Sequence, residues 1–195
     1  MCMKTNISKS LLALSLLVCL PNLAEAHILL GTPHGFQDGF LHPLTGWDHL
    51  LAMVAVGLWA AQHRGRALWL IPLSFVSVML LGGILGVAGV AMPGAELTIA
   101  ISVLTLGLLV ATTTRFRPSL SMAVVGLFAL FHGFAHGHEM PAAASALAFS
   151  VGFVLATALL HGLGLAAGLA LQEKPRVLRW AGAVIAASSF CFFLG

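Results

Sequence analysis

Apolar residues fill this chain in long, nearly continuous runs that are separated by short breaks. The breaks carry charged and turn-forming residues, in the stretches HRGR, MPGA, RFRP, EMP and QEKPR. Each run is close to the roughly 20 helical residues that cross a bilayer. The pattern therefore predicts an all-α integral membrane protein with six transmembrane helices, near residues 40–61, 67–90, 96–113, 119–138, 142–171 and 177–194.

The first 26 residues have the features of an export signal. Lys4 and Lys9 precede a short apolar run over residues 11–20, and Ala24 and Ala26 occupy the small-residue positions of a cleavage site. An uncleaved first membrane helix is the alternative, but the run is well below the ~20 residues that a span needs. The sequence predicts a cleavable signal peptide over residues 1–26 and one membrane domain over residues 27–195.

Basic residues of the mature chain fall only in or beside alternate breaks. They are Arg64 and Arg66, then Arg115 and Arg117, then Lys174, Arg176 and Arg179. Because cytoplasmic loops carry the excess of Lys and Arg, the first, third and fifth breaks are predicted to be cytoplasmic. Both mature termini then lie outside.

Composition narrows the class of protein further. The chain is 59% hydrophobic and 8% charged, with a mean hydropathy of +1.03, which is too little charge to cover a soluble domain. The net charge is +3, but the basic residues form no patch interleaved with aromatic residues, so no nucleic-acid partner is expected. No Walker or dinucleotide motif occurs, so we expect neither ATP hydrolysis nor a prosthetic group.

Glycines recur four residues apart in three of the predicted helices. The pairs are Gly82 and Gly86, Gly133 and Gly137, and Gly164 and Gly168. Small residues at this spacing let membrane helices approach closely, so a packing role is expected for them.

A first polar cluster, HPLTGWDH over residues 42–49, enters the first predicted span from outside. Pro43 suits the first position of a helix, which would place Asp48 and His49 inside the span. Ionisable side chains at such depth cost about 2.5–3.5 kcal/mol on insertion scales, so they are candidates for function.

A second polar cluster, FHGFAHGHEMP over residues 131–141, ends the fourth predicted span. His132, His136 and Glu139 are spaced by four and seven residues, so they project from one helix face, whereas His138 points elsewhere. The first span runs inward and the fourth outward, so both clusters are expected in the outer half of the membrane.

Imidazole nitrogens and carboxylate oxygens are ligands for divalent nickel, cobalt, copper or zinc. The predicted metal ligands are His42, Asp48, His49, His132, His136 and Glu139. A proton relay is the main alternative for such residues inside a membrane.

Three further histidines are weaker candidates for binding the metal. His27 becomes the mature N-terminus if cleavage follows Ala26, His34 lies in the external lead-in, and His138 lies near the mouth. His161 lies deep in the fifth span, either as a lower station on the metal path or as a packing residue. His63, at the cytoplasmic edge, is expected to be a solvated loop residue.

The two clusters resemble the motifs of the HupE/UreJ family of bacterial nickel permeases. The first-span motif His-x5-Asp-His matches His42, Asp48 and His49, and Phe-His-Gly-x-Ala-His-Gly-x-Glu matches residues 131–139. The export signal and six spans also match, so the resemblance covers essentially the whole chain. It implies uptake of Ni²⁺, sometimes Co²⁺, for hydrogenase or urease. It also implies a multi-pass protein of the bacterial cytoplasmic (inner) membrane, with both mature termini in the periplasm. Spacing alone indicates only a divalent ion with nitrogen and oxygen ligands.

Two other functions fit the same residues. A membrane metalloenzyme would use three ligands, a metal-bound water and Glu139 as general base. A non-transporting metal-binding maturation protein would hold metal without passing it. The expected partners are a divalent metal ion and the lipid bilayer, and the oligomeric state stays open.

Overall fold

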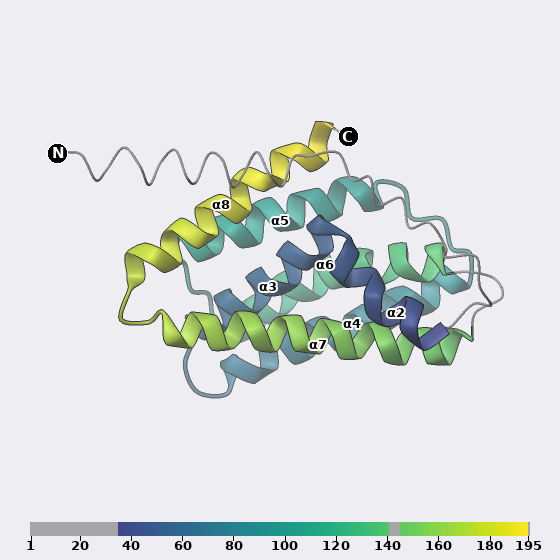
Figure 1. The fold of residues 1–195 in the computed structure, drawn as a ribbon, viewed down its shortest axis with the longest axis horizontal. Coiled ribbons are helices and arrows are strands. Elements are labelled where there is room, and N and C mark those ends of the chain that lie inside the picture. The colour runs from purple at the N-terminus through teal and green to yellow at the C-terminus, as the bar shows by residue number, and fades with distance from the viewer. Residues whose placement is uncertain (1–34, 141–144, 195) are drawn as a thin grey trace.

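A computed structural model of the chain describes residues 35–140 and 145–194. The predicted signal peptide, His27 and His34 lie outside these ranges. The described residues form helices joined by short connections, without strands. The helices are α2 (Gly35–Thr45), α3 (Trp47–Ala61), α4 (Ala67–Val87), α5 (Ala95–Thr112), α6 (Pro118–Glu139), α7 (Ala146–Ala170) and α8 (Pro175–Leu194), as Figure 1 shows.

Five of these helices, α4 to α8, are long and apolar enough to cross a membrane. The bent pair α2 and α3 would make a sixth span if it is counted as one. The outer surfaces of the bundle expose large apolar side chains, among them Trp69, Leu73 and Ile84 on α4 and Leu159 and Leu163 on α7. Exposing so continuous an apolar surface to water is unfavourable, whereas contact with lipid is not, so the protein is a multi-pass membrane protein.

The first predicted span is not one continuous helix, so that part of the prediction is wrong. α2 and α3 meet at an angle of 79°. Gly46 between them is extended, with φ −83° and ψ 113°. Pro43, predicted to open the helix, lies near the end of α2 instead. Its ring nitrogen cannot donate to the carbonyl one turn earlier, and proline is a common cause of a sharp bend in a helix.

The helices pack as three units. Unit A contains α2, α3 and α7, unit B contains α4 and α6, and unit C contains α5 and α8, each with its most extensive contacts inside the unit. Figure 1 shows α5 and α8 running side by side. The contacts between units, such as those of α3 with α5, are smaller.

Glycines close the contacts inside each unit. A methyl group at Gly133 would overlap the Met79 carbonyl in unit B, and one at Gly164 would overlap the Val54 carbonyl in unit A. In unit C a methyl group at Gly182 would press on the Ala111 amide. The glycine pairs predicted from the sequence therefore bring backbones together, as small residues do in membrane bundles.

Charge is divided between the two ends of the bundle. The described Lys and Arg residues lie at the end where α3 joins α4, α5 joins α6 and α7 joins α8, which we call the basic end (Figure 1). Of the acidic residues in the described ranges, only Glu173 is at this end. Asp38, Asp48, Glu96 and Glu139 lie in the opposite half, together with both histidine clusters.

Candidate metal centre

Three histidines converge where α3 of unit A meets α6 of unit B. His49, His132 and His136 are 9%, 0% and 2% exposed. The ring centroid of His49 lies 4.2 Å from that of His136 and 5.1 Å from that of His132. One ring nitrogen from each histidine lies within 4.8 Å of the other two. We call these three residues the triad.

A second set of potential ligands lies directly beside the triad, nearer the surface. His42 Nε2 is 3.2 Å from Glu139 Oε2, and the rings of His42 and His136 have centroids 4.6 Å apart. The ligand atoms of His42, His136 and Glu139 also lie within 4.8 Å of one another. We call these residues the rim set, because His42 and Glu139 are partly exposed. His136 belongs to both sets.

The bend at Gly46 explains how residues close in sequence serve both sets. His42 lies in the last turn of α2 and His49 in the first turn of α3, and the change of direction brings both rings to α6. A methyl group at position 46 would lie 3.1 Å from Asp48 Oδ1 and from His49 Nδ1. Glycine at this position therefore leaves Asp48 and His49 room to pair.

Asp48 lies behind His49 and belongs to neither set. Its Oδ1 accepts hydrogen bonds from His49 Nδ1 at 2.7 Å and from the His49 backbone amide at 2.8 Å. A carboxylate only accepts, so Nδ1 of His49 carries the proton and Nε2 carries the lone pair. That Nε2 is buried without a hydrogen-bond partner in the described chain. Carboxylates commonly orient a metal-binding histidine in this way.

Ser102 on α5 performs the same task for His132 and was not predicted. The fully buried hydroxyl donates to the Ile99 carbonyl at 2.6 Å, so its oxygen accepts from His132 Nε2 at 2.9 Å. The lone pair of His132 is then on Nδ1, which has no partner among the described residues. The only signal in the sequence is a serine in an apolar helix, and several other helices contain one.

His63 is not the solvated loop residue that the sequence suggested. It is 7% exposed, and its Nδ1 donates to the Trp59 carbonyl at 3.0 Å. Its Nε2 lies 3.0 Å from the Ser121 hydroxyl, which donates to it. The chain folds back after α3, so the ring packs against Trp59 and α6 instead of facing water. Both nitrogens are occupied, which leaves no ligand atom.

A hollow of about 630 Å³ adjoins the rim set. It lies between the connection from α4 to α5 and the end of α6, and Glu96, His138 and Glu139 line it. His138 is exposed, stacks on Phe134 and belongs to neither ligand set. We call this hollow the vestibule. Two carboxylates and an imidazole at its wall would attract cations.

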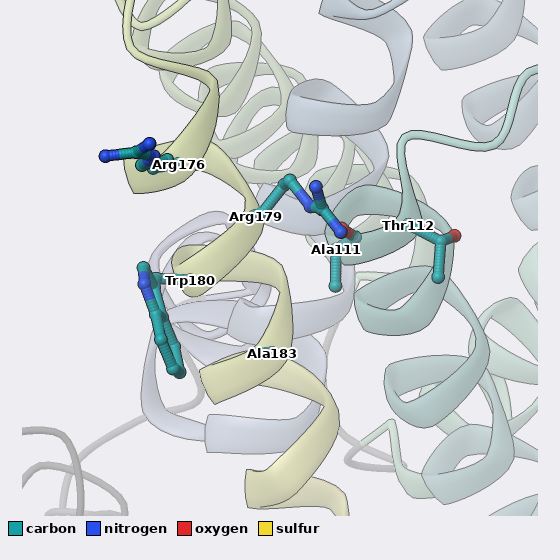
Figure 2. A pocket seen from close by; sticks show the side chains of 6 residues that line it. All are labelled: Ala111, Thr112, Arg176, Arg179, Trp180 and Ala183. Atoms are coloured by element: carbon teal, nitrogen blue, oxygen red, sulfur yellow. The ribbon is translucent and has the colours of Figure 1, made fainter. Parts of the chain in front are cut away.

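A second hollow, of about 400 Å³, lies at the basic end between α5 and α8. Figure 2 shows Arg179 reaching toward Ala111, and Arg179 Nε donates to the Ala111 carbonyl at 3.0 Å. The side chains of Arg176 and Trp180 point away from Ala111. Neither a histidine nor a carboxylate is among the described residues that line it. This hollow therefore offers no ligand for a transition metal.

The fold and the site together define a multi-pass helical membrane protein with a buried histidine cluster reached from one end. The chain matches the model of the HupE / UreJ protein family over residues 13–192. It is also 42% identical over 193 residues to Protein HupE of Rhizobium leguminosarum bv. viciae, covering 98% of each chain. The chain therefore belongs to the HupE/UreJ family, which confirms the resemblance. No solved structure matches it.

Proposed function

We propose that this protein is a metal permease that takes up Ni²⁺, or Co²⁺, across the bacterial cytoplasmic membrane to supply hydrogenase or urease. The observation that carries the proposal is the triad. One ring nitrogen of each histidine lies within 4.8 Å of the other two, and each histidine has a buried ring nitrogen without a hydrogen-bond partner in the described chain. Membership of the HupE/UreJ family supports the choice of nickel.

The chemistry of the triad favours a divalent transition metal. Imidazole nitrogens suit nickel, cobalt, copper and zinc, whereas Mg²⁺ and Ca²⁺ prefer oxygen ligands. A buried polar atom without a partner costs about 1–3 kcal/mol. Unpartnered nitrogens on His49, His132 and His136 would be satisfied together by one ion.

The two ligand sets provide a stepwise path for the ion. It would leave water in the vestibule, bind His42, His136 and Glu139, and then exchange the outer ligands for His49 and His132. His136 is common to both sets, so the ion need never be fully released between them. Conduction requires binding that is strong enough for entrance and weak enough for release, and several adjoining sites achieve this.

The direction of transport follows from the distribution of charge. Under the positive-inside rule the basic end faces the cytoplasm, so the vestibule and the rim set face the periplasm. An export signal over residues 1–26 would give the same orientation, because it places the mature N-terminus outside.

Uptake into liposomes that contain only this protein tests the proposal. With a metal-sensitive dye inside, Ni²⁺, Co²⁺, Zn²⁺ and Cu²⁺ are compared, and flux of Ni²⁺ or Co²⁺ is expected. His136→Ala should weaken metal binding and lower the flux by about tenfold or more, because it removes one ligand from each set. Leu127→Ala, on the lipid-facing side of the same helix, should leave the flux unchanged.

Other results would point to the other functions. Tight metal binding without flux in wild-type liposomes would indicate a non-transporting metal-binding protein. Metal-dependent turnover of a substrate without flux would indicate an enzyme. Normal flux in His136→Ala would show that the ion does not pass through the triad.

A further inference from the structure

His161 is a buried histidine outside both ligand sets. It lies on α7 of unit A and is 3% exposed. Both of its ring nitrogens are buried without a hydrogen-bond partner in the described chain. A buried polar group left in this state is costly, and its presence requires an explanation.

Packing alone does not supply that explanation. Leucine has a similar volume, carries no polar atoms and already occupies buried positions on α7, at Leu160 and Leu165. The same fold also satisfies a structural histidine fully, because both nitrogens of His63 have partners. His161 differs from His63 in the way that the triad does, by keeping lone pairs available.

His161 and the triad share one aromatic neighbour, Phe75. The centroid of Phe75 on α4 lies 5.7 Å from that of His132 and 5.0 Å from that of His161. Phe75 is fully buried and meets His161 at 89°, edge to face. Phe75 therefore connects the triad to His161 through two ring contacts, and these contacts run from unit B to unit A.

Weaker metal-ligand groups lie one helical turn from His161 on α7 and one turn from Phe75 on α4. Thr157 precedes His161 by four residues and Met79 follows Phe75 by four, so each shares a face with its partner. The Thr157 hydroxyl contacts the Met79 sulfur at 3.8 Å, and both residues are buried. One imidazole with hydroxyl and thioether groups nearby would bind a divalent transition metal more weakly than three imidazoles do.

We propose that His161 is a second binding position for the transported divalent transition metal, next to Phe75 and outside the triad. This inference rests on the proposed transport function and assigns it an exit station. An ion that leaves three imidazoles for one moves from a stronger to a weaker site, which favours release. The bound ion would then supply the partner that a ring nitrogen of His161 lacks in the described chain.

The test is His161→Leu, with three measurements on the purified protein. The apparent melting temperature should be equal to wild type or higher, because an unpartnered imidazole is replaced by an apolar side chain. Equilibrium binding of Ni²⁺ in detergent should stay within about threefold of wild type, because the triad is intact. Flux of Ni²⁺ into liposomes should fall by about tenfold or more.

Two further variants sharpen the result. Leu160→Met is the matched control on the neighbouring position of α7 and should keep wild-type flux. His161→Gln keeps a polar side chain but lacks the imidazole, so its flux should also fall. Wild-type flux in either His161 variant would overturn the proposal.

The remaining outcomes are also decisive. A large loss of stability in both His161 variants would overturn the proposal, because the imidazole would then serve the fold. Absence of flux in wild-type liposomes would instead overturn the proposed transport function. Loss of flux in His161→Leu with triad binding and stability intact would support the exit station.

Discussion

His63 and His132 are both buried against a serine hydroxyl, yet their rings end in different states. Ser121 donates to His63, whose other nitrogen donates to a backbone carbonyl. The Ser102 hydroxyl donates a hydrogen bond to the Ile99 carbonyl, so its oxygen accepts one from His132. The direction of one hydrogen bond thus separates a structural histidine from one that keeps a lone pair.

The first prediction uses this contrast. Ser102→Ala removes the acceptor that holds His132 Nε2–H, so Nδ1 is no longer fixed as the ligand atom. The affinity for Ni²⁺ should fall by about tenfold, the lower end of the range for such supporting residues. Nitrogen NMR of the metal-free protein, with labelled histidine, should show the Nε2–H form of His132 in wild type and a mixture in the variant.

Ser121→Ala is the matched control for this experiment. It leaves His63 Nε2 without a donor, so it should lower the melting temperature and leave Ni²⁺ affinity at the wild-type value. Equal loss of affinity in both variants would show that Ser102 acts through general packing and not through His132.

Part of the site can be predicted from the sequence, because part of it is local. His132, His136 and Glu139 share a helix face through their spacing alone, and the structure places two of them in each ligand set. The roles of Ser102 and His63 depend on contacts between helices, whereas Asp48 pairs with its neighbour in sequence, His49. Ser102 is 30 residues from His132, and His63 is 58 residues from Ser121, so no local pattern connects them.

At the scale of helices, the break at Gly46 could not be predicted from the sequence either. Pro72 lies inside α4 and that helix continues unbroken to Val87. Pro43 lies inside α2, and there the chain turns three residues later. A proline permits a bend without requiring it, and the packing of α2 and α3 along α7 decides the outcome.

The second prediction concerns the contact of α3 with α7. Gly164→Ala would push a methyl group into the Val54 carbonyl, so the two helices must separate. The stability should fall by about 1–3 kcal/mol, as in other overpacked contacts. Gly162→Ala, on the same helix but facing open space, should be neutral or slightly stabilising. Thermal unfolding in detergent measures both variants.

Equal melting temperatures for Gly164→Ala and Gly162→Ala would contradict this prediction, because they would mean that α3 and α7 are not in close backbone contact.

For the molecule as a whole, the limits of five of the six predicted long helices could be predicted. The observed α4 to α8 start and end within four residues of the predicted spans, because the length of each apolar run in the sequence sets the length of its helix. Their arrangement into three units could not. Helix α4 is apolar on all sides, so its sequence does not say which face meets α6 and which meets lipid.

The third prediction is the orientation of the whole molecule. The alternation of basic breaks places the C-terminus outside, so a reporter that is active only in the periplasm should work when fused after Gly195. The same reporter inserted at Arg117, at the basic end, should be inactive. A C-terminus in the cytoplasm would contradict the predicted orientation and the inward direction of transport.

The glycines that lock each unit have a consequence for how the ion can move. Units A and B are each closed by backbone contacts, and the triad takes His49 from one and His132 and His136 from the other. Bound metal would therefore bridge two rigid bodies, and release would require them to rock apart, as repeats do in alternating-access transporters. Spin-label distances from α3 to α6 should then change when Ni²⁺ binds, whereas those from α4 to α6 should not.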